Sequence, residues 1–130
     1  MLTLKRFSSF MLCTALAGLA GCGESSSNCG PVGLNLGPAT ATVDHTAAPP
    51  ANSQMFSASF QFRATQGCPA ITAALVNSNW TVSDPSVQLS APQATQVTAT
   101  CTATVATPVT ITATPVSGEM FTGHASLTCN

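Results

Sequence analysis

The chain carries very little charge. Of its 130 residues, 3 are lysine or arginine and 4 are aspartate or glutamate, which makes 5 % of the sequence. Nucleic-acid binders show a basic stripe or patch, and anionic lipid headgroups bind polybasic segments. Neither can be built from so few cations. We therefore expect no nucleic-acid partner and no electrostatic attachment to a membrane.

Groups that carry catalysis are equally scarce. The sequence has 2 histidines and no tyrosine, and its serines include no Gly-x-Ser-x-Gly nucleophile elbow. Asp44 precedes His45, but no third group stands at the spacing of a metal or acid–base site. The cysteines show no CxxC or Cys/His spacing. We expect no enzyme, no cofactor and no metal, with His45 in a surface loop and His124 solvated on the outer face of a strand.

The N-terminus is typical of an exported protein. Lys5 and Arg6 form a positive region, and residues 7–19 form an apolar run that is too short to span a bilayer. The run leads into the sequence LAGC, which ends at Cys22. This motif resembles the lipobox of bacterial lipoproteins, in which the cysteine is acylated and becomes the first mature residue. The alternative is an ordinary secretory signal cleaved nearby.

The lipobox resemblance divides the chain into three parts. Residues 1–21 are then a lipoprotein signal peptide, residues 22–30 a lipidated tether, and residues 31–130 a folded domain. Stable anchoring needs two or three acyl chains, since one chain holds only marginally. The protein is then held in the cell envelope by its lipid. Because Gly23 rather than aspartate follows the cysteine, the resemblance implies the outer membrane of a Gram-negative host.

Alternating apolar and polar residues predict strands throughout the domain. The clearest is 56–63, where every second residue is phenylalanine or alanine, the period of a half-buried strand. Threonine, which is abundant, is β-branched and suits a pleated surface. The other predicted strands are 34–43 with a break at Gly37-Pro38, 80–82, 87–89, 97–105, 109–113 and 121–129. About seven strands and no helical period predict an all-β, Ig-like antiparallel β-sandwich.

Three segments resemble the bacterial Ig-like domains of group 2. NWTVSDPSVQLS, residues 79–90, is similar to their Trp-containing strand, Ser-Asp-Pro turn and following strand. PVTITATP, residues 108–115, resembles their penultimate strand, and ASLTCN, residues 125–130, resembles their last strand. Here Thr107-Pro108 replaces the glycine that usually precedes the penultimate strand. The resemblance implies surface display, adhesion or a spacer role, and the family shares no active site.

The cysteines of the expected domain indicate disulfides. Cys13 leaves with the signal peptide and Cys22 takes the lipid, so four remain. An even number in an exported domain predicts two bridges, and three pairings are possible. Strand direction favours Cys29–Cys68, because Cys29 begins the first strand and Cys68 follows the second, and those two ends meet in an antiparallel pair.

Strand direction likewise favours a Cys101–Cys129 bridge. The strands that carry these two cysteines run the same way, and both cysteines fall on inward faces, so the bridge would join the two sheets. The inward residues are otherwise small, which predicts a thin core filled by the aromatic side chains Phe56, Phe60, Phe62, Trp80 and Phe121. We expect Trp80 to be buried against the bridge, which would then quench its fluorescence.

Two classes of function are compatible with these features. The first is a non-catalytic, lipid-anchored cell-envelope module for adhesion or for interaction with a protein or polysaccharide. The alternative is a small ligand-binding or envelope-assembly accessory lipoprotein. A flat, threonine-rich sheet favours the first class, whereas a concave pocket with convergent polar groups favours the second.

Overall fold

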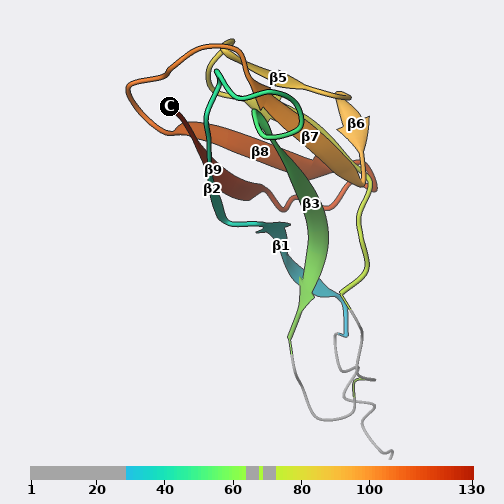
Figure 1. Cartoon of the computed structure of the whole chain (residues 1–130). Helices are drawn as coiled ribbons and strands as arrows, with labels where there is room; N and C mark the ends of the chain where they lie inside the picture. Colours follow the sequence, from blue (N-terminus) through green and yellow to red (C-terminus); the bar gives the residue numbers. More distant parts are fainter. Residues whose placement is uncertain (1–28, 64–67, 69–72) are drawn as a thin grey trace, which may run out of the picture.

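The computed structural model describes residues 29–63, 68 and 73–130 (Figure 1). The expected signal peptide, the acylated Cys22 and the tether as far as Asn28 lie outside the described residues. So does most of the turn expected at 64–70. Within the described ranges, no helix has the length and apolar character needed to cross a membrane.

Nine strands form two sheets in the described part of the chain (Figure 1). The first sheet contains, in spatial order, β1 (Pro31–Gly37), β3 (Ser53–Phe62), β7 (Gln96–Cys101) and β5 (Val87–Leu89). The second contains β2 (Thr40–Val43), β9 (Gly123–Cys129), β8 (Val109–Pro115), β4 (Ser78–Val82) and β6 (Gln93–Ala94). The two sheets pack around a shared apolar core. The predicted all-β sandwich is confirmed.

The strand order is that of an immunoglobulin sandwich. In that fold one sheet has the order A-B-E-D and the other contains G-F-C. The order β1-β3-β7-β5 reproduces the first sheet, and β9-β8-β4 reproduces the second. The two additional strands, β2 and β6, lie at the edges of the second sheet, which accounts for nine strands where the sequence predicted about seven.

The predicted first strand is divided between the two sheets. β1 pairs with β3 in the four-stranded sheet, and β2 pairs with β9 in the other. The chain crosses between the sheets at Gly37-Pro38, where the sequence predicted a break. β2 continues in the direction of β1 and therefore runs parallel to β9. The expectation of purely antiparallel sheets is wrong at this one pair.

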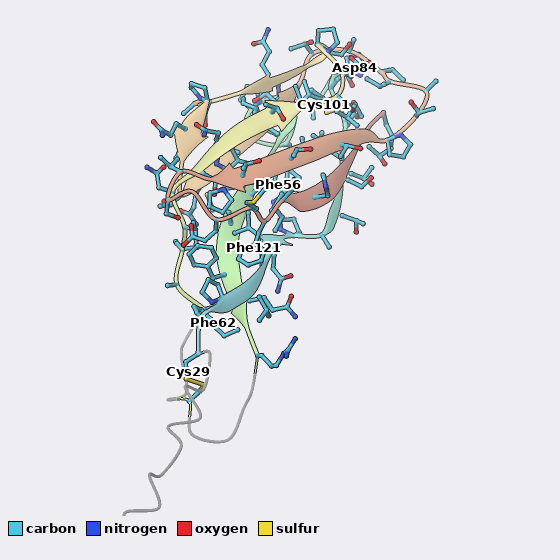
Figure 2. The ribbon with its side chains drawn as sticks, turned by 180° about the vertical axis from the view of Figure 1, so that it is seen from behind. Cys29, Phe56, Phe62, Asp84, Cys101 and Phe121 are labelled. Carbon is cyan, nitrogen blue, oxygen red and sulfur yellow. A yellow bond between two sulfur atoms is a disulfide. The ribbon has the colours of Figure 1, made fainter. Side chains whose placement is uncertain are left out.

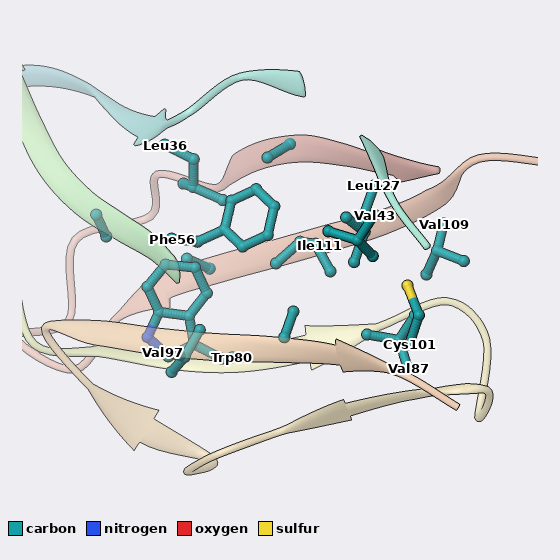
Figure 3. Packing of buried hydrophobic residues seen from close by; sticks show 14 of the residues in the cluster. Leu36, Val43, Phe56, Trp80, Val87, Val97, Cys101, Val109, Ile111 and Leu127 are labelled. Carbon is teal, nitrogen blue, oxygen red and sulfur yellow. The ribbon is translucent and has the colours of Figure 1, made fainter. Parts of the chain in front are cut away.

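The core is centred on β3, β7, β8 and β9 (Figure 3). Phe56, Ile111 and Leu127 are fully buried there. Three of the aromatic residues expected to fill the core are only partly buried, namely Phe60, Phe62 and Phe121. Phe121 precedes β9 rather than lying in it. For Phe60 and Phe62 the register gives the reason. β7 pairs with the first half of β3 only, so the second half extends with β1 beyond the strands that bury Phe56.

Both predicted disulfides are present, and they lie at opposite ends of the molecule (Figure 2). Cys101–Cys129 joins β7 of one sheet to β9 of the other, and both residues are 1 % exposed. Cys29–Cys68 joins the residues that precede β1 and follow β3. The Cys101–Cys129 bridge therefore links the two sheets covalently, and the Cys29–Cys68 bridge links the start of β1 to the end of β3.

Trp80 is buried as expected, but it does not pack against the Cys101–Cys129 bridge. Trp80 pairs with Ala113, which pairs with Gly123, and Cys129 lies six residues further along β9. At about 3.3 Å per residue this is about 20 Å along the strand. The indole Nε1–H donates instead to the carbonyl of Ala94 at 2.8 Å. Figure 3 shows Trp80 near Phe56, with Cys101 at the other end of the core.

This separation predicts that disulfide reduction leaves the fluorescence of Trp80 unchanged while the fold persists. The indole is too far from the Cys101–Cys129 sulfur atoms for contact quenching. The measurement is the emission spectrum of the protein before and after reduction, with far-ultraviolet circular dichroism to verify that the sheets remain. Urea-unfolded protein supplies the spectrum of the solvated indole. A rise in intensity with unchanged dichroism would place Trp80 beside the bridge after all.

Candidate interaction surface

The charged side chains of the described residues lie outside the strands. Asp44 follows β2, Arg63 follows β3, Asp84 lies between β4 and β5, and Glu119 lies between β8 and β9. Asp84 lies at the end of the sandwich that carries Cys101 (Figure 2). Asp44 belongs to the same end, because it follows Val43, which pairs with Cys129, whereas Arg63 follows the far end of β3. The faces of both sheets are therefore built from uncharged side chains and His124.

Asp44 and Asp84 serve their own turns. Asp44 Oδ1 accepts hydrogen bonds from the backbone N–H and the hydroxyl of Thr46, at 2.8 and 2.7 Å. These bonds hold the pKa of the Asp44 carboxyl below its usual range. Asp84 Oδ1 accepts from the backbone N–H of Ser86, which likewise lowers the pKa of Asp84. Both are turn-capping carboxylates, and no group of three or more potential metal ligands occurs in the ranges that the structure describes.

His45 contacts the residue that follows the last strand. Its backbone N–H donates to the carbonyl of Asn130 at 3.0 Å, and its Nδ1 lies 2.6 Å from the same oxygen. The hydroxyl of Thr104 is 3.3 Å from the same ring nitrogen. His45 thus joins three segments at the end of the sandwich that carries Cys101. It is half-buried, and these contacts give it a structural role at that end.

The outer face of the five-stranded sheet is a continuous array of small polar side chains, which we call the threonine face. β2, β4, β8 and β9 all contribute to it, because every second residue of each strand points away from the core. Its eleven members are Thr40, Thr42, Asn79, Thr81, Gln93, Thr110, Thr112, Thr114, His124, Ser126 and Thr128. None of them is a carboxylate, a lysine or an arginine.

The strand register arranges the threonine face in rows. Thr112 lies opposite Thr81 on β4 and opposite His124 on β9. Its hydroxyl is 3.2 Å from His124 Nδ1. Ser126 lies opposite Thr110 on β8 and opposite Thr40 on β2. Side chains directly opposite each other in a sheet are close enough to interact, so hydroxyl groups follow one another across adjacent strands.

Threonine suits a surface of this kind for two physical reasons. Its branched Cβ restricts χ1, so it loses less rotamer freedom on binding than a long side chain does. Its hydroxyl both donates and accepts hydrogen bonds, and its methyl group adds apolar contact. The alternation of threonine with apolar residues in 108–115 was visible in the sequence, where it predicted a strand. That four strands align their hydroxyl groups side by side required the sheet order.

The outer face of the four-stranded sheet has a different composition. It presents Ser57, Ser59 and Gln61 of β3 and Thr98 and Thr100 of β7, together with Gln88, Gln96 and the 55 % exposed Met55. Its hydroxyl groups are thus interspersed with more long side chains than those of the threonine face. Glutamine and methionine side chains lose more conformational freedom on ordering than threonine does. We therefore take the threonine face as the candidate interaction surface, and the face around Met55 supplies control positions.

These features define a disulfide-bonded, all-β sandwich with the strand order of an immunoglobulin domain and one threonine-rich, uncharged face. Comparison with family models, with curated proteins and with solved structures gives no match to this chain.

Proposed function

We propose that this protein is a non-catalytic, lipid-anchored module of the bacterial cell envelope that binds a protein or polysaccharide through its threonine face. Cys22 carries the lipid, and the Ig-like sandwich presents the binding surface. The observation that carries the proposal is the alignment of uncharged hydroxyl groups across β2, β4, β8 and β9.

The chemistry of the threonine face fits an uncharged polar partner. Hydroxyl groups in rows can exchange hydrogen bonds with sugar hydroxyls or with the backbone of an extended protein segment. The absence of carboxylate and ammonium groups from the face leaves little for a highly charged partner to pair with. The outermost strands of the sheet, β2 and β6, are short, which limits sheet-edge pairing as an alternative mode.

Photo-crosslinking in cells tests the binding face. Benzoylphenylalanine in place of Thr110 should give a discrete crosslinked product, because Thr110 is exposed on the threonine face. The matched control has the same amino acid in place of Gln96, which is exposed on the other sheet. A Thr110→Lys variant should reduce retention by the purified partner about tenfold, which corresponds to about 1.4 kcal/mol. A crosslinked product from the Gln96 position alone would place binding on the four-stranded sheet and contradict the proposal.

The lipid anchor is tested separately. Mass spectrometry of the mature protein should find an acylated Cys22 at its N-terminus, and a Cys22→Ala variant should leave the membrane fraction. An unmodified Cys22, or a variant that stays membrane-bound, contradicts the anchor without affecting the assignment of the binding face.

A further inference from the structure

The second half of β3 and its partner β1 form an extension of the sandwich, which we call the arm. β3 pairs with β7 over Ser53–Ser57 and with β1 over Ser57–Phe62. In Figure 1 this two-stranded part reaches away from the body of the sandwich, and Figure 2 places Phe62 and Cys29 at its end. The arm is therefore the part of the domain closest in the chain to the expected lipid at Cys22.

Several exposed apolar side chains lie at this end of the sandwich, whereas the 55 % exposed Met55 lies opposite Thr98 in its body. The large apolar residues that remain exposed include Val32 on β1 at 42 %, Leu75 beside β3 at 51 %, and Met120 at 98 % in the loop that leads to β9. Phe62 and Phe121 are only partly buried. Apolar groups gathered at one end of a soluble domain mark a binding surface more often than singly scattered ones do.

The length of the tether limits how far the arm can lie from a membrane. Cys29 lies seven positions after Cys22, and an extended chain spans at most about 3.6 Å per residue. The arm therefore begins within about 25 Å of an acylated Cys22. β3 has ten residues, or about 33 Å of strand, so the opposite end is held much further away when the arm points to the lipid.

The distribution of charge agrees with this orientation. Arg63, the one cation left after signal cleavage, directly follows β3 at the end of the arm. Arginine is tolerated at a membrane interface, where its stem lies among apolar groups and its guanidinium contacts headgroups. Asp84 lies at the opposite end in Figure 2, and Asp44 follows Val43, which pairs with Cys129 at that same end. Among the residues that the structure describes, Glu119 is the carboxylate in the loop beside the arm, and it accepts a hydrogen bond from the hydroxyl of Ser117. The sequence places one further carboxylate, Glu24, in the tether.

We propose that the arm rests on the bilayer that holds the lipid anchor, with Val32, Phe62 and Met120 inserted at the level of the headgroups. This inference relies on the acylation of Cys22 in the proposed function, and it adds a second, non-covalent membrane contact. It also fixes the orientation of the domain. The strands then stand away from the membrane, and the threonine face is turned sideways and remains accessible to other envelope components.

The test uses the acylated protein in vesicles of phosphatidylethanolamine and phosphatidylglycerol whose acyl chains carry bromine near the headgroup. A Met120→Trp variant adds a reporter at a fully exposed position of the loop beside the arm. Bromine quenches tryptophan on contact, so its added emission should fall about twofold in these vesicles relative to unbrominated ones. Unsubstituted protein supplies the baseline of the buried Trp80.

An Ala103→Trp variant is the matched control. Ala103 is exposed in the loop between β7 and β8, at the opposite end of the sandwich, and its added emission should not be quenched. Adding Val32→Asp to the Met120→Trp variant should reduce the quenching, because a carboxylate disfavours insertion. Equal quenching at both positions, or none at position 120, overturns the proposal.

The outcomes separate this proposal from the one on which it rests. Mass spectrometry of the same samples reports whether Cys22 is acylated. An acylated protein with no quenching at position 120 leaves the anchor intact and rejects the membrane contact. Shielding of that position in cells but not in pure lipid vesicles would assign the arm to a protein partner instead, and it would also reject the lipid surface.

Discussion

Trp80→Ala is expected to destabilise the domain by about 3 to 5 kcal/mol, the usual cost of removing a large aromatic side chain from a core. Trp80 is 3 % exposed, and its indole N–H donates to the carbonyl of Ala94, so the variant loses both apolar contacts and a hydrogen bond. A domain of this size has a total stability of about 5 to 15 kcal/mol. Urea denaturation followed by circular dichroism measures the difference in free energy of unfolding.

Two further variants give this experiment its controls. Thr81→Ala changes the next residue of β4, whose side chain is exposed on the outer face, and should cost less than about 0.5 kcal/mol. Trp80→Phe keeps an aromatic ring but removes the donor to Ala94, which should cost about 1 to 3 kcal/mol. A loss below about 1 kcal/mol for Trp80→Ala would show that the indole is not part of the core.

The second large effect is expected from the Cys101→Ala/Cys129→Ala double variant. The bridge spans a sequence separation of 28, and restricting an unfolded loop of that length contributes about 3 to 4 kcal/mol in the chain-entropy model. Both residues are 1 % exposed, so the variant also leaves unfilled space between the sheets. Urea denaturation should therefore show a loss at the upper end of this range or beyond it.

The Cys29→Ala/Cys68→Ala double variant is the matched comparison. Its separation of 39 gives a similar entropic contribution, about 4 kcal/mol. Cys29 and Cys68 are partly exposed, however, so no buried space is created. The Cys101/Cys129 variant should therefore be the less stable of the two. If the Cys29/Cys68 variant were the less stable of the two, the Cys101–Cys129 bridge would contribute less to stability than the Cys29–Cys68 bridge.

Much of the fold follows from local pattern. The alternation in 56–63 correctly placed Phe56 and Ala58 in the core. The same parity argument put Cys101 and Cys129 on inward faces, and strand direction favoured, among three possible pairings, the one that the structure shows. The break at Gly37-Pro38 marked the point at which the chain changes sheets.

The threonine face and the arm could not be predicted from the sequence. Each threonine strand was visible as a strand, but the threonine face exists because β2, β9, β8 and β4 are neighbours in one sheet. The arm could not be predicted from the sequence for a similar reason. Phe60 and Phe62 share the inward parity of Phe56, and only the length of β7 determines that they extend beyond the best-covered part of the core.

The sequence by itself determined the apolar face of each strand and that the chain forms a β-sandwich, and it favoured the cysteine pairing that is present. Side-chain direction in a strand depends only on the two-residue period, which is a local property. The tertiary structure decided how far each strand slides along its neighbour, and therefore that Trp80 and the Cys101–Cys129 bridge lie at opposite ends of the core. A shift of two residues leaves every side chain on the same face, so alternation alone cannot specify register.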